Sequence, residues 1–227
     1  MAYTDKDTVK NYSGVNWNAG LDDFIDFIIV SVKDYIEKFC GDERFGVRKF
    51  EKPSPDDNET RRYDGNGQIK LNVGDLKSLT SLTLDNLLLV VDEDFYLYPL
   101  NSVELNRPFE WIELIQPETR LNVNSRIQSS VPYIFEVAQR NVVLVGKWRY
   151  SDAVPSDIKL AATKLVAGVI KENINDEDVR ELKSEKVGDY TVNYQDITKV
   201  AHALKVDEIL NQYKRKVVTP TAGIRKI

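Results

Sequence analysis

The clearest periodic pattern of hydrophobic positions lies between Leu21 and Phe39, where apolar residues recur at steps of three and four. The series is Leu21, Phe24, Ile25, Ile28, Val32, Tyr35, Ile36 and Phe39. This spacing gathers the apolar side chains on one face of a helix. Gly41 follows directly, and glycine commonly ends helices. The pattern therefore predicts an amphipathic helix over 21–39.

A second helical pattern begins at Pro155, which suits a first helical turn because its missing N–H donor is not needed there. Its apolar stripe comprises Ile158, Ala161, Ala162, Leu165, Val166, Val169 and Ile170. The small residues Ala167 and Gly168 favour close packing against another helix. We predict a central core helix here, then a short polar helix or linker over 175–183 and a short strand over 189–193. A last amphipathic helix is predicted from Val206, Ile209, Leu210 and Tyr213.

The middle of the chain changes to short β-prone segments. A polar loop over 50–60 leads to the turn Asp64-Gly65-Asn66-Gly67, after which apolar and polar residues alternate as in a strand. A calcium-loop interpretation of this turn fails, because Gln68 and Asp75 stand where such a loop needs an oxygen ligand and a closing glutamate. Further runs are Leu79–Leu84, Leu87–Val91, Phe95–Leu97, Val103–Leu105, Trp111–Ile115, Ile134–Val137 and Val142–Val145. Frequent turn residues between them favour an antiparallel sheet or small barrel.

The order of these elements predicts an α+β protein, a helical bundle with a large inserted antiparallel β-rich module and an extended C-terminal arm. The predicted parts are 1–49 and 149–213 for the helical domain, 50–148 for the β-rich module and 214–227 for the arm. We predict a structural junction where the β-rich module meets the helical domain. Its residues are Trp148, Pro155, Gly188 and Tyr190.

Charge is distributed unevenly along the 227 residues. The formal net charge is -5, which argues against a general nucleic-acid binder. The N-terminus lacks the apolar run of a signal peptide and no stretch is long enough to span a membrane, so we expect no membrane association. The C-terminal arm is basic and has apolar anchors, which favours an arm that binds a partner over a solvated terminus. Its candidate contact residues are Lys214, Arg215, Lys216, Val217, Val218, Thr219, Arg225, Lys226 and Ile227.

Catalytic chemistry is not predicted from the sequence. The single cysteine, Cys40, ends an apolar helical pattern and is interpreted as a core thiol. The single histidine, His202, is expected to be solvated or to cap a helix, and we find no nucleophile-base pair, phosphate-binding glycine loop or multi-histidine set. Acidic clusters such as 92–94 fall at predicted turns, where solvation accounts for them. We therefore predict no catalytic residue, no cofactor and no metal site.

One group of aromatic residues leaves two interpretations open. Phe95, Tyr96, Tyr98, Phe109 and Trp111 form either a stacking platform for single-stranded nucleic acid or a packed core or protein interface. A stacking platform needs interleaved basic residues, and acidic residues surround these positions instead. The pattern favours core or interface packing.

Several segments in order resemble the head-tail connector (adaptor) family of tailed bacteriophages. They are Tyr3-Thr4-Asp5, Tyr63-Asp64-Gly65-Asn66-Gly67 with Leu71-Asn72-Val73, Gly146-Lys147-Trp148 with Val154-Pro155-Ser156-Asp157-Ile158-Lys159, Ser184-Glu185-Lys186-Val187-Gly188-Asp189-Tyr190, and Ile209-Leu210-Asn211-Gln212-Tyr213-Lys214-Arg215. The resemblance spans most of the chain and rests on the order and spacing of the set.

The resemblance implies a non-enzymatic virion protein, assembled in the host cytoplasm and located at the neck. Such connectors form rings, typically of twelve subunits, below the portal protein. They extend the DNA channel and present a surface to a stopper or tail-completion protein, while viral DNA passes without sequence-specific binding. Their C-terminal arm commonly reaches the portal. Two alternatives from other classes are an intracellular adaptor that binds a protein or nucleic acid through the β-rich module, and a hydrolase that uses the acidic turns.

Overall fold

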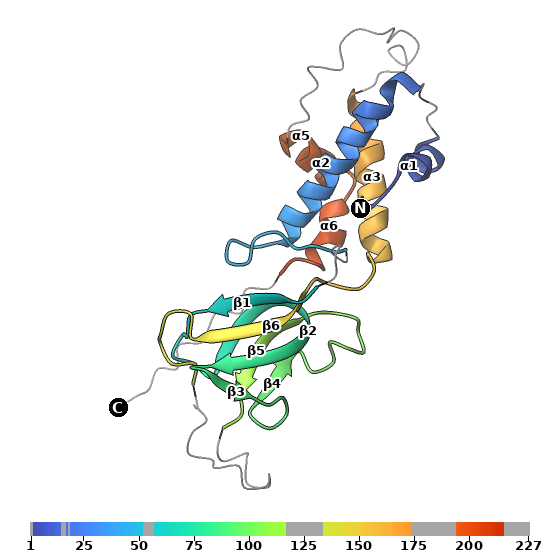
Figure 1. Ribbon diagram of the computed structural model, residues 1–227. Helices are drawn as coiled ribbons and strands as arrows, with labels where there is room; N and C mark the ends of the chain where they lie inside the picture. Colours follow the sequence, from blue (N-terminus) through green and yellow to red (C-terminus); the bar gives the residue numbers. More distant parts are fainter. Residues whose placement is uncertain are drawn as a thin grey trace. The chain divides into compact units, whose positions relative to one another are not determined.

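The computed structural model describes residues 2–14, 17, 19–51, 57–116, 134–173 and 194–215. Over these residues it is a mixed α+β protein with five α-helices and a six-stranded antiparallel sheet, which confirms the predicted class. The chain divides into two compact units, drawn in Figure 1. The helical unit comprises Met1–Arg48 and Val154–Val217, and the sheet unit contains Lys49–Ala153. The sequence analysis expects these divisions at 49/50 and 148/149.

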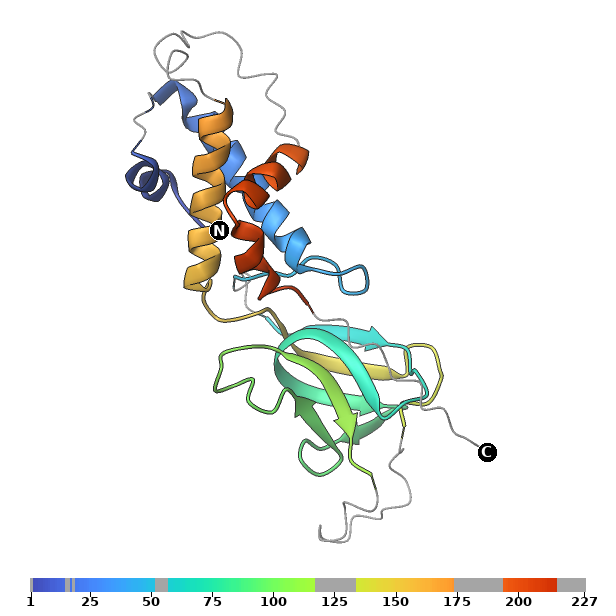
Figure 2. The same ribbon diagram turned by 180° about the vertical axis from the view of Figure 1, so that it is seen from behind.

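The helical unit is built around one long helix. Its elements are α1 (Lys6–Ser13), a 3-10 turn η1 (Ala19–Leu21), α2 (Asp22–Cys40), α3 (Ser156–Asn173), α5 (Tyr194–Ala203) and α6 (Val206–Asn211). Helix α3 packs against α1, α2, α5 and α6. Figures 1 and 2 show α2 alongside α3, with α5 and α6 next to these two helices. The helices on either side of the sheet unit in sequence therefore share one core.

The two long helices form where the hydrophobic periodicity predicts them. Helix α2 buries the face that carries Ile25, Ile28 and Val32, and Cys40 is buried in the same core, as expected. Gly41 ends α2 because the chain turns back tightly there, and a Cβ at this position would lie 2.3 Å from the Gly46 carbonyl oxygen. In α3, a Cβ on Gly168 would lie 2.5 Å from Val200 Cγ1 in α5. The small residues do allow close helix packing.

The sheet unit is an antiparallel sheet with one long, bent strand. Its strands are β1 (Glu59–Tyr63), β2 (Lys70–Leu84), β3 (Leu87–Leu89), β4 (Phe95–Tyr98), β5 (Phe109–Leu114) and β6 (Val142–Trp148). Their order is β1-β6-β2-β5-β4, and β3 pairs with β2. The first part of β2 pairs with β5, and its second part pairs with β6 and β3. Strand β2 thus links the two halves of the sheet around a core that includes Leu71, Leu82, Ile112 and Leu144.

The bend in β2 is a bulge at Gly74, whose φ of 79° lies in the left-handed region that favours glycine. The register with β5 shifts between Asn72 and Leu76, which takes the intervening carbonyls out of that ladder. Side chains compensate for this loss. The Val73 carbonyl accepts hydrogen bonds from Tyr63 Oη at 2.9 Å and from Trp148 Nε1 at 3.1 Å. The bulge therefore ties three strands together.

Two predicted strands are wrong. Residues 103–105 lie in successive turns, where Leu105 N–H donates to Asn101 O and Asn106 N–H to Val103 O, so the backbone is satisfied locally and no ladder forms. In the run 134–137, Phe135 alone is buried and makes an isolated bridge to Gln68. Apolar side chains are present in both runs without the sheet neighbours that a strand requires.

Helix α5 is absent from the prediction, and α6 ends two residues before Tyr213. The polar segment predicted over 175–183, the strand over 189–193, and the junction residues Gly188 and Tyr190 lie outside the described residues.

Candidate functional site

The described start of the C-terminal arm, Lys214 and Arg215, is anchored in the helical unit. Arg215 N–H donates to Cys40 O at 2.9 Å, and Arg215 Nη1 lies 3.3 Å from Asp42 Oδ2. The same nitrogen donates to Gly46 O at 3.3 Å. Although Arg215 was predicted to belong to the arm, its side chain is buried against Asp42 beside the end of α2, and the Asp42 side chain is 10% exposed. The other proposed arm residues, 216–227, lie outside the described residues.

A tight turn after α2 provides the acceptors for Arg215. Asp42 and Gly46 form an isolated bridge, and Phe45 N–H donates to Asp42 Oδ1 at 2.6 Å. The Arg215 guanidinium lies 5.5 Å from the Phe45 ring centre. A carboxylate that is held by the backbone and buried beside an arginine gives a fixed, charge-assisted contact.

A second arginine holds the residues just before this contact. Arg48 is buried, its N–H donates to Glu37 O at 2.9 Å, and its Nη1 donates to Tyr213 O. The Tyr213 hydroxyl in turn donates to Asp157 Oδ2 at 3.3 Å. We call the set Asp42, Arg48, Tyr213 and Arg215 the arm root. It holds residues 213–215 on the helical unit.

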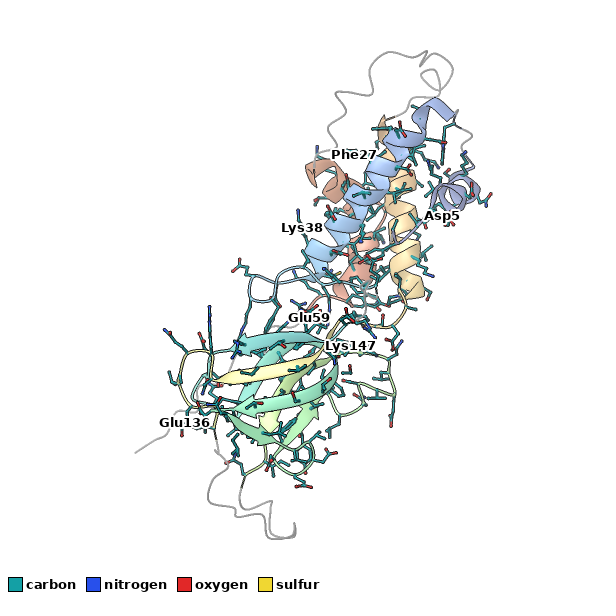
Figure 3. The ribbon with its side chains drawn as sticks, viewed as in Figure 1. Asp5, Phe27, Lys38, Glu59, Glu136 and Lys147 are labelled. Carbon is teal, nitrogen blue, oxygen red and sulfur yellow. The ribbon has the colours of Figure 1, made fainter. Side chains whose placement is uncertain are left out.

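The predicted junction residues Trp148 and Pro155 lie in different units. Trp148 is buried at the end of β6, and besides its bond to Val73 O it carries the Arg61 guanidinium 4.3 Å from its ring centre. Pro155 precedes α3, and its carbonyl accepts from Lys159 N–H at 3.1 Å. Figure 3 labels Lys147, the residue before Trp148 in β6, and Glu59 on the neighbouring strand β1. Trp148 is thus a structural residue of the sheet.

The segments that enter and leave the sheet unit lie side by side. Tyr150 N–H donates to Lys49 O at 3.0 Å, and the rings of Phe50 and Tyr150 are 5.2 Å apart. Just before this contact, Arg149 N–H donates to Asp75 O. The sheet unit therefore begins and ends at nearly the same place.

The turn Asp64–Gly67 packs on the segment before β6. Asp64 Oδ1 accepts from Arg140 N–H at 2.7 Å, and Gly65 N–H donates to Ala138 O at 3.0 Å. A Cβ on Gly65 would lie 1.6 Å from the carbonyl oxygen of Glu136, a residue labelled in Figure 3. The segment 64–67 connects β1 to β2 with a bend at Gly67, and the Asp64 carboxylate serves as an acceptor for a backbone N–H.

The five aromatic residues separate into two groups. Phe95 is buried in the sheet core and Phe109 packs against it. Tyr98 and Trp111 stack with ring centres 5.5 Å apart, and Tyr96 meets Tyr98 edge-on. These three side chains are half-buried, on the face of β4 and β5 opposite the core. Alternation within β4 puts Phe95 on the face opposite Tyr96 and Tyr98. On β5, Phe109 packs on the core although it lies two residues before Trp111, at the place where the register with β2 shifts.

An exposed apolar loop, residues 99–108, joins β4 to β5, and it was not predicted from the sequence. Ser102 is buried and its hydroxyl donates to Pro99 O and Pro108 O, which holds the loop compactly. Leu100, Val103 and Leu105 are nonetheless 68%, 74% and 52% exposed. The apolar residues in the run 103–105 led to the prediction of a strand. The segment instead forms turns, and Asn106 at their end has a positive φ of 50°.

Among the described residues, four titratable groups have shifted pKa values, and the cause of each shift is a hydrogen bond or burial. The Thr8 backbone N–H lowers the pKa of Asp5, a hydrogen bond to Asp26 raises that of Lys6, and burial raises that of Tyr35. His202 is exposed in α5 with Nδ1 3.2 Å from Asp207 Oδ2, and this hydrogen bond lowers the pKa of Asp207. Within the described ranges, no set of three or more His, Cys, Asp or Glu side chains could hold a metal ion. No described helix is long and apolar enough to cross a membrane.

No protein-family model and no curated protein matches this chain.

Proposed function

We propose that this chain is a head-tail connector (adaptor) of a tailed bacteriophage, a virion structural protein that forms a ring below the portal at the neck. The observation that carries the proposal is the arm root. Because Arg48 and Arg215 hold residues 213–215 firmly, the basic segment that follows starts from a defined point on the helical unit. A tail anchored in this way is suited to reach a neighbouring protein.

The proposal includes the finer architecture, a helical bundle into which the sheet unit is inserted. The hydrogen bond between Tyr150 and Lys49 supports it, because a domain whose two ends are adjacent can be carried by another domain without distorting it. Residues 1–48 and 154–215 would then make the helical body, and 49–153 the insertion.

Each part has a role in this proposal. Copies of the chain assemble into a ring, with twelve subunits as the family resemblance implies, and the arm of residues 216–227 binds the portal. The sheet unit meets a stopper or tail-completion protein. The net charge of -5 weakens adhesion of viral DNA as it passes through the channel. A channel lined by Lys and Arg would contradict this last role.

The test is assembly of the full chain with the portal protein encoded by the same phage genome. Electron micrographs of the mixture should show a ring with an axial channel stacked on the portal. A chain that stays monomeric and does not bind portal would refute the connector function.

A deletion of 216–227 tests the arm separately. Because Arg215 is retained, the helical unit should keep its stability while portal binding is lost. The matched control, Lys159→Ala, removes one exposed positive charge on α3, outside the arm, and should bind portal normally. Normal portal binding by the deletion variant would remove the arm from the proposal.

The alternative is an intracellular adaptor that binds a protein through the sheet unit, and the exposed loop 99–108 is the observation that favours it. The triple variant Leu100→Ser, Val103→Ser, Leu105→Ser removes the apolar surface of this loop without touching its buried Ser102. The adaptor function is supported over the connector if two results are obtained together. The unaltered chain binds a cellular protein without forming rings, and the triple variant does not bind that protein.

A further inference from the structure

The outer face of β4 and β5 carries three aromatic side chains next to an exposed apolar loop. Tyr98 and Trp111 stack with each other, and Tyr96 meets Tyr98 edge-on. Strand β4 lies at one edge of the sheet, as Figure 1 shows. The loop 99–108 joins the two strands, and its exposed apolar residues are Leu100, Val103 and Leu105. This part of the sheet unit therefore presents aromatic and apolar side chains to the solvent.

The same stretch of chain is strongly acidic. Residues 90–116 contain one basic residue, Arg107, and six acidic residues, which are Asp92, Glu93, Asp94, Glu104, Glu110 and Glu113. Lys70 of β2 lies 3.4 Å from Glu113 and offsets one of these charges, whereas Glu93 and Glu104 are exposed. We call the turn 92–94, the three aromatic side chains and the loop 99–108 the acidic aromatic surface. Its negative potential repels nucleic acid and attracts a basic partner.

The segment that follows the arm root has the complementary chemistry. Residues 216–227 contain three basic residues and no acidic one. Along this segment Val217 and Val218 come first, Pro220 follows, and the basic pair Arg225 and Lys226 stands near the end. Proline docks on aromatic rings, and cations bind over ring faces and beside carboxylates. The arm is therefore chemically suited to the acidic aromatic surface.

Chain connectivity brings the arm close to the sheet unit. Arg48 is the last residue of the helical unit, and its side chain donates to Tyr213 O. Lys49, the next residue, begins the sheet unit. The arm thus starts within about one side-chain length of the point where the sheet unit begins. Twelve extended residues span up to about 40 Å, which sets the reach of the segment 216–227.

The acidic aromatic surface lies within this reach. The hydrogen bond between Tyr150 and Lys49 joins the two ends of the sheet unit, and the neighbouring Arg149 N–H donates to Asp75 O. The following residue of β2 pairs with Phe109 at the start of β5. With strands about 5 Å apart and a rise of about 3.4 Å per residue, all of β5 lies within about 30 Å of Lys49.

The surface and the arm also match in order. The apolar loop lies nearest the start of the sheet unit, because Asn106 Oδ1 accepts from Lys77 Nζ of β2 at 2.6 Å. The acidic turn lies at the far end, because Asp94 O accepts from Ile115 N–H just after β5. A segment that runs outward along this surface meets apolar, aromatic and acidic side chains in turn. The arm offers apolar, proline and basic residues in the same order.

We propose that residues 216–227 bind to the acidic aromatic surface of their own chain. The two valines cover the apolar loop, Pro220 packs on the aromatic rings, and the basic pair binds the acidic turn. The same chain is favoured as the source because the arm root tethers the arm near the start of the sheet unit, at an effective concentration on the order of 1 mM. This docking goes beyond the connector function and does not depend on it. Where that function operates, the portal displaces the arm.

The first test adds a synthetic peptide of residues 216–227 to the chain that lacks them. The tethered arm is mostly bound only if the dissociation constant of the peptide lies below the effective concentration of the arm. Isothermal titration calorimetry should therefore give a dissociation constant below about 1 mM. A weaker constant would overturn the proposal.

A charge exchange tests the site on the sheet unit. Glu93→Lys should weaken peptide binding about fivefold. The matched control is Glu136→Lys, which reverses an exposed charge in the segment before β6, labelled in Figure 3, and should stay within about twofold of the unaltered surface. A peptide with Arg225→Glu and Lys226→Glu should bind the unaltered surface weakly and regain affinity on Glu93→Lys. Equal effects of the two protein variants would overturn the site.

Trypsin measures docking in the full chain, because it cleaves the arm at its three basic residues when the arm is released. Glu93→Lys should raise the cleavage rate about fivefold, with an unchanged denaturant midpoint as the check on folding. Glu136→Lys should leave the rate unchanged. Protection of the unaltered chain should be independent of protein concentration. Protection that rises with concentration would assign the arm to a second copy and overturn docking within one chain.

Portal binding separates this proposal from the connector function. If both hold, Glu93→Lys should bind portal up to about fivefold more tightly, because less of the arm is held on the sheet unit. Peptide binding without any portal binding would refute the connector function alone. Portal binding by a chain whose sheet unit does not bind the peptide would refute the docking alone.

Discussion

The helical unit and the sheet unit hold themselves together in different ways. The helical unit joins residues from both sides of the sheet unit in sequence, and its polar contacts connect distant positions. Tyr3 bonds to Glu37, Thr4 to Thr163, and Arg215 to Asp42. The described residues of the sheet unit come from one stretch of chain and pack around an apolar core, and side-chain hydrogen bonds from Tyr63 and Trp148 compensate for the bulge in β2.

This difference teaches which changes each unit tolerates. A unit that closes between distant segments depends on a few specific polar pairs, because each pair selects one arrangement of helices that share similar apolar faces. The stability of a unit with local strand pairing depends on its apolar core and on hydrogen-bond partners for the backbone groups at irregular positions. The predictions below separate the two cases.

The largest predicted difference between the two units is whether an isolated fragment of each unit folds. Residues 49–153 should fold cooperatively alone, because the whole sheet and its core lie within them. Residues 154–227 alone should remain unfolded, because the buried face of α3 would lack α2. Circular dichroism with chemical denaturation measures both. A cooperative transition in 154–227 would remove the contrast between the units.

Arg215→Ala should destabilise the helical unit by about 3 kcal/mol, because it leaves the buried Asp42 carboxylate without its cation. Hydrogen exchange measured by mass spectrometry should show faster exchange in α2 and α6, with the sheet unit unchanged. Lys214→Ala, at the exposed neighbour, is the control and should change the stability by less than about 0.5 kcal/mol. Equal effects of the two variants would mean that the Asp42 pair contributes little.

Tyr63→Phe and Trp148→Phe each remove one of two donors to Val73 O and should each cost the sheet unit about 1 kcal/mol. The double variant leaves that carbonyl without either donor, so its loss should exceed the sum of the single losses by about 1 kcal/mol. Denaturant unfolding of the four proteins in the cycle measures this coupling. Strict additivity would show that water replaces the missing donors.

Asp5→Ala should have the smallest effect, about 1 kcal/mol at pH 7, because Asp5 caps α1 through Thr8 N–H at 2.8 Å. The folded protein lowers the pKa of Asp5, so this contribution is present above the unfolded pKa and is lost as the pH falls through the folded one. The difference between Asp5→Ala and the unaltered protein should therefore shrink below about pH 4 in thermal unfolding curves. Asp5→Asn retains a capping oxygen and should lose less. An effect that is constant down to pH 2 would exclude a charged cap.

Much of the fold could be predicted from hydrophobic spacing, because a long helix or strand repeats the same spacing of apolar residues several times. The buried face of α2 and the alternation after Gly67 are examples. Helix α5 could not be predicted, since only Ile197, Val200 and Ala201 are buried in its described part. The run 103–105 misled the prediction because local turns satisfy its backbone, and the run 134–137 did so because Phe135 alone bonds to Gly67 and Gln68 in an isolated bridge.

The arm root could be predicted only in part. The basic composition marks the C-terminal segment, but charge alone does not distinguish Arg215, which is buried, from Lys214, which is exposed. The partner Asp42 lies in a turn near the other end of the sequence, and no local pattern connects them.

The hydrogen bond between Tyr150 and Lys49 has an evolutionary consequence. Because the two ends of the sheet unit are adjacent, a short linker could replace the whole of 49–153 at a small loop-closure cost to the helices. A lineage can therefore lose this segment, or exchange it for another of the same end-to-end spacing, in a single recombination event. The helical unit and the sheet unit can then diversify at different rates, each under selection from its own contacts.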